Sequence, residues 1–414
     1  MSTVASLESS DQPIVVIGAG FAGLAAADAL VAAGCDVLVL EARGRVGGRV
    51  HSERLQNGAL VELGGEFITG GYAVTEGLAA RFSIPVDGMG IHYPDRELDP
   101  DPGLVPGVLT AAASAVAQAA LADPLAPARD VLKRAVRNEA ARDLLEMRLQ
   151  SALAYPIADL DARFALKALD LVQARETRRL RGGNQQLAVE LAAGLGDRVL
   201  LDCPVREVHE EPTGLRVIAD SNEFRARACV VAIPIALLPD LRFEPALPEA
   251  TVGAISAIPT SAAAKLALPL REAVDPRALM SAADRFWAWT TGCDQVGARS
   301  VAAWAGATAV LERLGVGAGP EQWLHRLGQL WPQLELDPAE ARLTVWQHDP
   351  WARGAYSVLP PVANAAGRAV SASPAANLIF AGEHTAEPGW TGTMEGALRS
   401  GLRAAEELLR GGGA

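Results

Sequence analysis

Three glycines and one acid near the start of the chain have the spacing of a dinucleotide-binding turn. In GAGFAG, residues 18–23, the first glycine allows a tight turn, the second lets backbone approach a pyrophosphate, and the third lets a helix lie close to a sheet. Glu41 follows at the distance at which an acid accepts hydrogen bonds from both ribose hydroxyls. Because its charge would repel a 2′-phosphate, the pattern predicts a dinucleotide that lacks this group.

The elements that must position these residues surround them in the sequence. Residues 13–18 (PIVVIG) have the pattern of a buried strand, an alanine-rich helix runs to about Ala33, and residues 36–40 form a second apolar strand. Strand, glycine turn, helix, strand and acid therefore come in the order of a dinucleotide-binding unit. The N-terminus of this helix would supply N–H groups and partial positive charge to the phosphates.

A basic, glycine-rich loop follows Glu41 directly. Arg43 and Arg49 bracket the pair Gly47-Gly48. Two guanidinium groups here would add positive charge against a pyrophosphate that backbone N–H groups already hold. The alternative is a basic surface loop; the place of the loop, just after the ribose-binding strand, favours the phosphate interpretation.

The other end of the chain carries a second glycine-rich segment. Residues 377–381 (NLIFA) predict a last buried strand that leads into Gly382 and Glu383, and residues 392–409 predict a last helix. Met394 begins the packing stripe of this helix, whose N-terminus would stabilise negative charge on a flat cofactor. By itself Glu383 is equally well explained as an ordinary loop acid.

The composition restricts the class of protein and its partners. Half of the 414 residues are apolar and 21% are charged, which indicates a globular protein, and the net charge of −12 disfavours nucleic acid and anionic lipid as partners. No uncharged apolar run reaches about 20 residues and no secretory leader is visible, so we expect a cytoplasmic protein that does not cross a membrane. The sequence leaves open whether the chain forms a homodimer.

Cysteine and histidine give no sign of a disulfide framework or a metal. The four cysteines contain no CxxC pair, so free thiols in a reducing compartment are expected. The six histidines lack the spacing of metal ligands, and no metal is expected.

The order of segments predicts a nucleotide-binding domain made of separate pieces. A chain of this length is too long for one core. We predict an α/β fold, α+β overall, in which a Rossmann-like domain interleaves with a substrate domain of sheet plus helices. The first domain would contain residues 1–90, 181–235 and 346–414, and the second residues 91–180 and 236–345. Helical periodicity runs through residues 108–180, and a new helix is predicted over residues 185–195.

The glycine turn and the C-terminal segment belong to a series of motifs that spans nearly the whole chain. In order these are IVVIGAGFAGLAAADAL…VLVLEARGRVGGRV, VELGGEFI, RGGNQQLAVELAAGL, Val205 before VVAIP, and FAGEHTAEPGWTGTMEGALRSG. With them the chain resembles the flavin-containing amine oxidase family, the group of monoamine and polyamine oxidases and L-amino-acid oxidases. The resemblance implies that the discontinuous domain binds FAD.

By the same likeness, Val205 would pair with the adenine through its backbone. The FAD-binding residues implied in full are Gly18, Gly20, Phe21, Ala22, Gly23, Glu41, Ala42, Arg43, Gly48, Arg49, Gly64, Gly65, Glu66, Phe67, Val205, Trp351, Gly382, Glu383, Thr393 and Met394.

Two absences refine this expectation. No second GxGxxG follows a strand, so electrons are expected to come from the substrate rather than from NADPH. Ala355 stands at the position that matches the flavin-linking cysteine of mammalian monoamine oxidases. The resemblance therefore implies non-covalent FAD.

Lys265 is a candidate catalytic residue. It lies in an apolar, strand-like stretch, SAAAKLALPL, where a buried lysine is costly unless something requires it. In the family, a lysine on the matching strand holds a water against flavin N5. The resemblance implies that Lys265 does so here and helps O2 to reoxidise the flavin; a purely structural lysine is the alternative.

Tyr356 and Thr393 are the other two candidates for the substrate side. Tyr356 resembles one wall of an aromatic cage that clamps the substrate amine, although a core aromatic would look the same. Many members have a second aromatic wall where this chain has Thr393, which leaves the cage open or polar on one side. Trp351 could flank the flavin or simply pack. The stretch after Gly65 lacks the arginine that holds a substrate carboxylate in L-amino-acid oxidases, so an amine without a carboxylate is favoured.

The implied reaction is hydride transfer from the amine-bearing carbon to flavin N5. The imine formed hydrolyses to an aldehyde or ketone, and O2 accepts the electrons to give hydrogen peroxide. The substrate amine must be neutral, because an ammonium has no lone pair to expel hydride. The alternatives are an FAD-dependent dehydrogenase or desaturase with a non-amine substrate, a redox-neutral flavin isomerase, and a non-catalytic partner protein stabilised by FAD.

Overall fold

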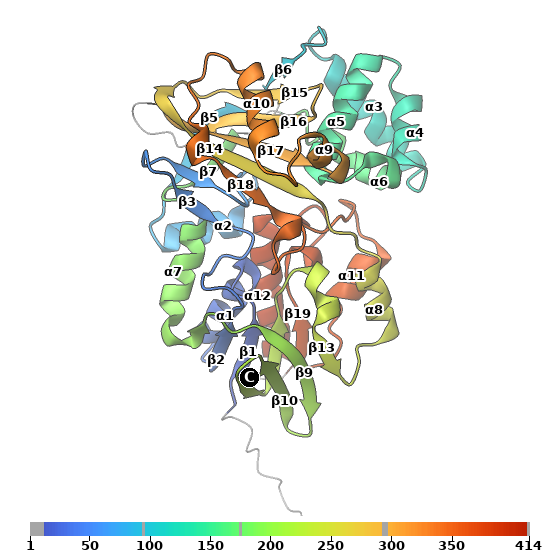
Figure 1. Cartoon of the computed structure of the whole chain (residues 1–414). Coiled ribbons are helices and arrows are strands. Elements are labelled where there is room, and N and C mark those ends of the chain that lie inside the picture. Colours follow the sequence, from blue (N-terminus) through green and yellow to red (C-terminus); the bar gives the residue numbers. More distant parts are fainter. Residues whose placement is uncertain (1–11, 93–95, 174–175, 292–296, 412–414) are drawn as a thin grey trace, which may run out of the picture. The chain divides into compact units, whose positions relative to one another are not determined.

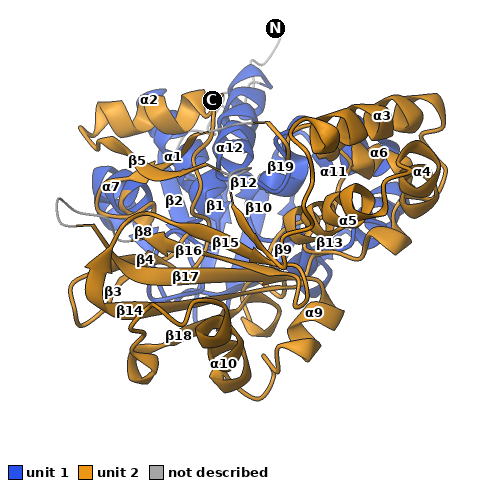
Figure 2. Cartoon of the chain, turned by 90° about the horizontal axis from the view of Figure 1, so that it is seen from above, with its two compact units in different colours: residues 1–48, 187–259, 363–414 blue, residues 49–186, 260–362 orange. Residues whose placement is uncertain are grey.

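A computed structural model describes residues 12–92, 96–173, 176–291 and 297–411. The chain forms two compact units, which Figure 2 shows in different colours. Unit 1 contains the described residues of segments Met1–Gly48, Leu187–Pro259 and Ala363–Ala414. Unit 2 contains those of segments Arg49–Gln186 and Thr260–Val362. The predicted fold class, a Rossmann-like domain in pieces interleaved with a domain of sheet and helices, is confirmed.

The units are bounded at different residues from the predicted domains. Residues 49–90 and 346–362 belong to unit 2, because the hairpin within 49–90 packs on a strand of its large sheet. Residues 236–259 belong to unit 1, where one strand and one helix of this segment pack against other unit 1 elements. Which residues contact a cofactor stays a prediction.

A five-stranded parallel sheet forms the centre of unit 1 (Figure 1). Its strands, in the order β19-β12-β1-β2-β8, are β19 Leu378–Phe380, β12 Ala228–Val231, β1 Ile14–Ile17, β2 Val37–Leu40 and β8 Val199–Leu200. The β1 and β12 strands are buried along their whole length. This explains why they are continuously apolar, as strands of a parallel sheet covered on both faces are.

Two helices from opposite ends of the chain pack together in unit 1. They are α1 Phe21–Ala32 and α12 Met394–Arg410. A Cβ atom at Gly401 would lie 2.1 Å from the carbonyl oxygen of Ala22, so the crossing requires glycine at this position. The first and last segments of the sequence are thereby held on one sheet.

The rest of unit 1 is a smaller mixed sheet and its helices. The sheet has the order β11-β10-β9-β13, with β11 Glu223–Ala226, β10 Gly214–Ala219, β9 Val205–Glu211 and β13 Arg242–Glu244. Helices α8 Glu249–Ser256 and α11 Ala365–Ser371 pack on each other. Helix α7 Gln185–Leu195, which the sequence predicts at these residues, starts in unit 2 and continues in unit 1.

A six-stranded sheet organises unit 2 (Figure 1). Its order is β18-β14-β17-β16-β15-β6, with β18 Arg342–Val345, β14 Ala263–Val274, β17 Ala298–Gly306, β16 Phe286–Thr291, β15 Ala278–Ser281 and β6 Glu97–Asp99. Two antiparallel strand pairs complete the described strands of the unit, β3 Ser52–Arg54 with β4 Leu60–Glu62, and β5 Val86–His92 with β7 Glu176–Leu180.

Helices cover this sheet and extend from one end of it (Figure 1). They are α2 Ala73–Arg81, α3 Val108–Ala122, α4 Ala128–Ala135, α5 Glu139–Leu153, α6 Ala162–Ala165, α9 Thr308–Arg313 and α10 Glu321–Leu330. Helices α3 to α6 share one apolar core, and Trp323 of α10 packs under the sheet against Phe286. The predicted helical run through residue 180 is wrong at its end, because residues 176–180 pair with β5 as strand β7.

The described residues contain no membrane-spanning helix and three free thiols. No helix in the described ranges has both the length and the apolar character needed to cross a membrane. Cys35, Cys203 and Cys229 are free thiols, and burial raises the pKa of Cys203 and Cys229. Cys293 lies outside the described residues.

Candidate active site

The glycine turn of unit 1 has the geometry that its sequence predicts. Gly18 adopts φ +101°, which favours glycine. A Cβ atom at Gly23 would lie 1.9 Å from the carbonyl oxygen of Gly18, so this glycine permits close packing of helix on strand. At Gly20, by contrast, a Cβ atom would meet nothing within 4 Å, and no side chain caps α1. The space beside Gly20 is therefore open for a ligand to approach its backbone.

Glu41 joins this turn to the end of β2. The residue is 4% exposed, and its carboxylate accepts hydrogen bonds from the N–H groups of Ala19 at 2.7 Å and Arg43 at 2.9 Å. Each oxygen of an ionised carboxylate can accept more than one hydrogen bond. Glu41 can therefore hold the turn and still accept from ribose hydroxyls.

The basic loop after Glu41 lies against the glycine turn through its backbone. The N–H of Gly47 donates to the carbonyl of Ala19 at 2.8 Å, and Gly48 lies next to Gly20. The Arg43 guanidinium is mostly buried, 4.0 Å from a Glu41 oxygen. Ala42 lies between these two residues and is half-buried.

Arg49 and the predicted Gly64-Gly65 pair belong to unit 2. The Arg49 guanidinium donates to the carbonyl of Ala355 at 2.9 Å. Its own carbonyl accepts from the N–H of Gly65 at 3.1 Å, and a Cβ atom at Gly64 would lie 2.0 Å from it. The pair therefore allows close approach of two backbone segments, while its role in FAD binding stays a prediction.

At the C-terminal segment, Glu383 and Thr393 organise the start of α12. Glu383 is buried and accepts a hydrogen bond from the N–H of Gly392 at 2.9 Å. The Thr393 hydroxyl accepts from the N–H of Gly396 at 2.9 Å and donates to the carbonyl of Trp390 at 2.6 Å. Thr393 thus caps α12, a structural role that the sequence analysis did not assign, and its catalytic role stays a prediction.

Five further predicted residues of unit 1 are placed by its helices and strands. Met394 is the buried first residue of α12, Gly382 precedes Glu383 with φ +139°, and Val205 begins β9. Phe21 and Ala22 open α1 and are buried.

In unit 2, Lys265 is buried in a direct ion pair with Glu66. Lys265 is 2% exposed and Glu66 is 4% exposed. The ammonium donates to Glu66 Oε2 at 2.6 Å and to the carbonyl oxygen of Gly64 at 3.0 Å. Among the described residues these two are its hydrogen-bond acceptors, and Nζ also lies 5.4 Å from the centroid of the Trp289 ring. The two residues were predicted separately, and the structure brings them together.

Glu66 is held from its other side by residues that sequence analysis missed. Its second oxygen, Oε1, accepts from the Trp289 indole N–H at 2.9 Å and from the Thr291 hydroxyl at 3.4 Å. Trp289 and Thr291 stand at alternate positions of β16. The alternation in WAWTT, residues 287–291 of an apolar strand, is the signal that could have placed them on one face.

A second buried carboxylate, Glu62, was also missed. It is fully buried in β4, where it accepts from the backbone N–H of Asn184 at 2.7 Å and contacts the Ser52 hydroxyl at 2.7 Å. Burial raises the pKa of Glu62 to about 7, opposed mainly by the Asn184 hydrogen bond, while the nearby charge of Glu66 raises it further. An acid inside the run LVELGG was the available signal.

Aromatic side chains surround the ion pair on the same face of the sheet. Lys265, Trp304 and Trp287 stand opposite one another on β14, β17 and β16. The ring of Phe67 lies 5.2 Å from that of Trp287 and 5.1 Å from that of Trp289. Phe67 therefore packs on this aromatic face.

Tyr356 lies beside the same aromatic row. Its ring is parallel to that of Trp304, with the centroids 6.3 Å apart, and its hydroxyl donates to the carbonyl of Ala152 at 2.6 Å. Trp351 lies in the preceding turn and is half-buried. Its backbone N–H donates to the Asp349 carboxylate at 2.8 Å. The parallel packing of Tyr356 and Trp304 is consistent with an aromatic wall. That Tyr356 contacts a substrate amine stays a prediction.

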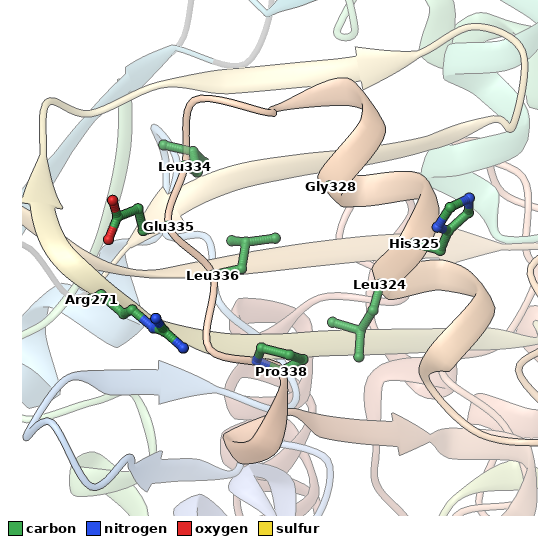
Figure 3. Close-up of a pocket in the computed structure, with 8 residues that line it drawn as sticks. All are labelled: Arg271, Leu324, His325, Gly328, Leu334, Glu335, Leu336 and Pro338. Carbon is green, nitrogen blue, oxygen red and sulfur yellow. The ribbon is translucent and has the colours of Figure 1, made fainter.

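Other hollows and clusters do not involve the predicted residues. Figure 3 shows a hollow of about 560 Å³ between α10, the segment 334–338 and Arg271 of β14. None of the predicted site residues is among its described lining residues. In the part of the chain that the structure describes, no three His, Cys, Asp or Glu side chains gather in a way that could hold a metal.

A glycine turn between parallel strands, closed by a buried acid, gives unit 1 a Rossmann-like architecture. The chain belongs to the flavin-containing amine oxidoreductase family, because the family model described as "Flavin containing amine oxidoreductase" matches residues 21–409. The resemblance seen in the sequence is thereby confirmed.

Individual relatives are distant but extend over nearly the whole chain. Lysine-specific histone demethylase 1 homolog 2 of Arabidopsis thaliana is 28% identical over 97% of this chain, which spans 59% of that protein. Amine oxidase [flavin-containing] B of Sus scrofa is 25% identical over 97% of this chain and 86% of its own length. The structure of a putrescine oxidase bound to putrescine is similar with a TM-score of 0.82 at 19% identity, covering 96% of this chain and 99% of the other.

Proposed function

We propose that this protein binds FAD non-covalently and oxidises a small amine that lacks a carboxylate, with O2 as electron acceptor. Membership of a flavin-containing family supports the cofactor, and the names of the relatives, amine oxidase B and putrescine oxidase, support an amine. The observation that carries the proposal is the buried Lys265, fixed on an aromatic sheet face at the position where the family lysine is expected.

The residues of unit 1 fit the nucleotide part of FAD. Open space beside Gly20 gives a pyrophosphate access to backbone N–H groups at the uncapped start of α1. The buried Glu41 carboxylate retains acceptor capacity for the ribose. Ala355, 8% exposed, offers no sulfur for a covalent link, which supports non-covalent binding.

When bound, FAD would accept hydride from the amine-bearing carbon and pass two electrons to O2, giving an imine and hydrogen peroxide. The task of the protein is to hold the amine neutral and in place. Burial of the amine beside apolar and aromatic side chains such as Trp304 and Tyr356 would disfavour its charged form and so lower its pKa. Lys265 would orient a water, the role that the family resemblance implies.

A second candidate is an amine dehydrogenase that passes electrons to a carrier. Reduction of O2 places negative charge on O2, which a nearby positive charge would stabilise. The Glu66 carboxylate lies 2.6 Å from the Lys265 ammonium and offsets that positive charge, which favours a different electron acceptor. The remainder of the reaction would be unchanged.

A panel of amines assayed for peroxide tests the proposal. We expect peroxide with mono- or diamines and none with the corresponding amino acids. A dye acceptor in parallel separates the two candidates, because a dehydrogenase would reduce the dye and form little peroxide. If neither peroxide nor reduced dye forms with any amine, the proposed reaction is wrong.

Gly20→Ala tests the proposed cofactor site. A Cβ atom at this position meets no protein atom within 4 Å, and the residue has an ordinary φ of −75°, so the variant should fold normally. The methyl group would occupy the approach to the pyrophosphate, and we expect FAD affinity to fall at least about tenfold. Quenching of FAD fluorescence on titration into apoprotein measures this.

The matched control is Gly253→Ala, an exposed helical glycine that also has open space. It should leave FAD affinity unchanged. Equal FAD affinity in the Gly20→Ala variant and the wild type would show that the pyrophosphate does not approach this turn.

A further inference from the structure

A pocket of about 250 Å³ in unit 2 is lined by arginines that the proposed reaction does not use. It lies among the β3–β4 hairpin, β5, the end of β7, β16 and β17. Its charged lining residues are Arg54, Arg179, Arg181, Arg299 and Asp87. Four guanidinium groups against one carboxylate are unusual for a chain whose net charge is −12.

The one acidic residue of the described lining is already matched. Asp87 receives hydrogen bonds from both arms of the Arg181 guanidinium, each at 2.8 Å. This contact holds the pKa of Asp87 below its usual range, so the residue stays charged and neutralises Arg181. Arg179 stands opposite Asp87 in the β5–β7 pair and its charge also lowers the pKa of Asp87, but the hydrogen bonds of this carboxylate go to Arg181.

Arg179 and Arg54 bind only neutral acceptors among the described residues. Arg179 donates to the Thr291 hydroxyl at 2.8 Å and to the Leu60 carbonyl at 3.4 Å. Arg54 donates to the Gly58 carbonyl at 3.2 Å. No described carboxylate lies within 4 Å of either guanidinium. Arg179 is also only partly exposed, so it is less hydrated than a surface arginine.

A guanidinium pairs best with a planar or tetrahedral oxyanion, to which it can donate two parallel hydrogen bonds. We propose that this pocket binds a small oxyanion, a carboxylate or a phosphate, between Arg179 and Arg54. Gly58 and Gly182 in the lining leave room for a ligand close to the backbone, because a Cβ atom there would meet nothing nearer than 4.0 Å; Gly88 faces the Glu176 carboxylate instead.

The pocket is connected to the buried ion pair by hydrogen bonds. Arg179 donates to the Thr291 hydroxyl, which donates to Glu66 Oε1 at 3.4 Å, and Glu66 Oε2 accepts from Lys265. In this chain of hydrogen bonds, an oxyanion on Arg179 would stand at one end and Lys265 at the other, with Thr291 and Glu66 between them. The proposed binding does not depend on the amine oxidase activity.

Isothermal titration calorimetry of the purified full-length protein tests the site. Phosphate, succinate and acetate are titrated separately, at constant ionic strength set with NaCl and in the presence of saturating FAD, which keeps phosphate out of a pyrophosphate site. We expect one saturable site for at least one of these anions. Comparing the three titrations shows whether the site prefers a carboxylate or a phosphate. Affinity should fall as NaCl rises, because chloride screens the charge.

Arg179→Gln and Arg54→Gln should each weaken binding about tenfold or more, the loss expected for a charge-assisted hydrogen bond. The control is Arg326→Gln, an exposed arginine of α10 outside the pocket, which should bind as the wild type does. Arg54 is exposed, so its variant remains informative if Arg179→Gln fails to fold. Binding that is equal in Arg54→Gln and the wild type, or no saturable binding below about 20 mM, would overturn the proposal.

Discussion

Replacing Lys265 with methionine is expected to lower the free energy of unfolding by about 3–5 kcal/mol. The substitution conserves length and apolar volume but leaves the Glu66 carboxylate buried at 4% exposure with neutral donors only. An unpaired buried charge loses hydration without receiving an opposite charge in return. Urea unfolding followed by circular dichroism, on the full chain with FAD at a fixed concentration, measures the change.

Two variants make this prediction specific. Arg206→Met removes a cation from an exposed pair with Asp220, whose side chains are 50% and 48% exposed, and should cost no more than about 1 kcal/mol. Adding Glu66→Gln to Lys265→Met should restore much of the lost stability, because the buried charge is removed and Gln still accepts from Trp289. If Lys265→Met costs no more than the exposed control, the buried ion pair contributes little.

Glu62→Gln is expected to remove a fall in stability between about pH 4.5 and pH 7. The pKa of Glu62 is raised from 4.5 to about 7 in the folded protein by burial, so the folded state binds its proton more tightly than the unfolded state does. Stability from this group is therefore full below pH 4.5 and is lost as pH rises through 7. The difference between the pKa of Glu62 in the unfolded and the folded state corresponds to about 3 kcal/mol of unfolding free energy.

Gln imitates the protonated form of this side chain. It can accept from the Asn184 N–H and donate to the Ser52 hydroxyl, the two contacts of Glu62. The free energy of unfolding of the variant should therefore exceed that of the wild type at pH 8 and approach it near pH 5. Glu53→Gln, on the half-exposed partner strand β3, is the control. If the free energy of unfolding changes with pH in the same way in Glu62→Gln and in the wild type, the pKa of Glu62 is not raised in the folded protein.

The sequence predicted the glycine turn and the strands around it well because their signals are local. The glycine turn needs Gly18 and Gly23 for backbone reasons that hold in any such fold, and the structure shows both. The apolar strands β1 and β2 are fixed by burial on two faces, and α7 was placed at its observed residues. Each of these signals depends on a few neighbouring residues.

The ion pair of unit 2 could not be predicted, because it joins residues distant in the sequence. Lys265 was identified from its apolar context and from the family resemblance, and Glu66 from a cofactor motif, but nothing in either segment indicates that they meet. Glu62, Trp289 and Thr291 were missed for the same reason, since their roles depend on the register of β4 and β16 around Glu66.

The compact units divide the chain at other residues than the predicted domains for a related cause. Residues 49–90 follow the nucleotide motif directly and were assigned to the same domain, yet their hairpin packs on β17 in unit 2. Strand β7 was hidden in a helical pattern because its partner, β5, lies about 90 residues earlier in the chain. Long-range strand pairing overrides local periodicity.

Anaerobic mixing of the FAD-loaded protein with amines tests the central claim most directly. If an amine is the electron donor, the absorbance of oxidised flavin near 450 nm should disappear without O2, in proportion to the amine added up to one equivalent, and the wild type should recover it when air is admitted. A protein that binds FAD but keeps this absorbance with every mono- and diamine would contradict the account, as would a protein that binds no FAD.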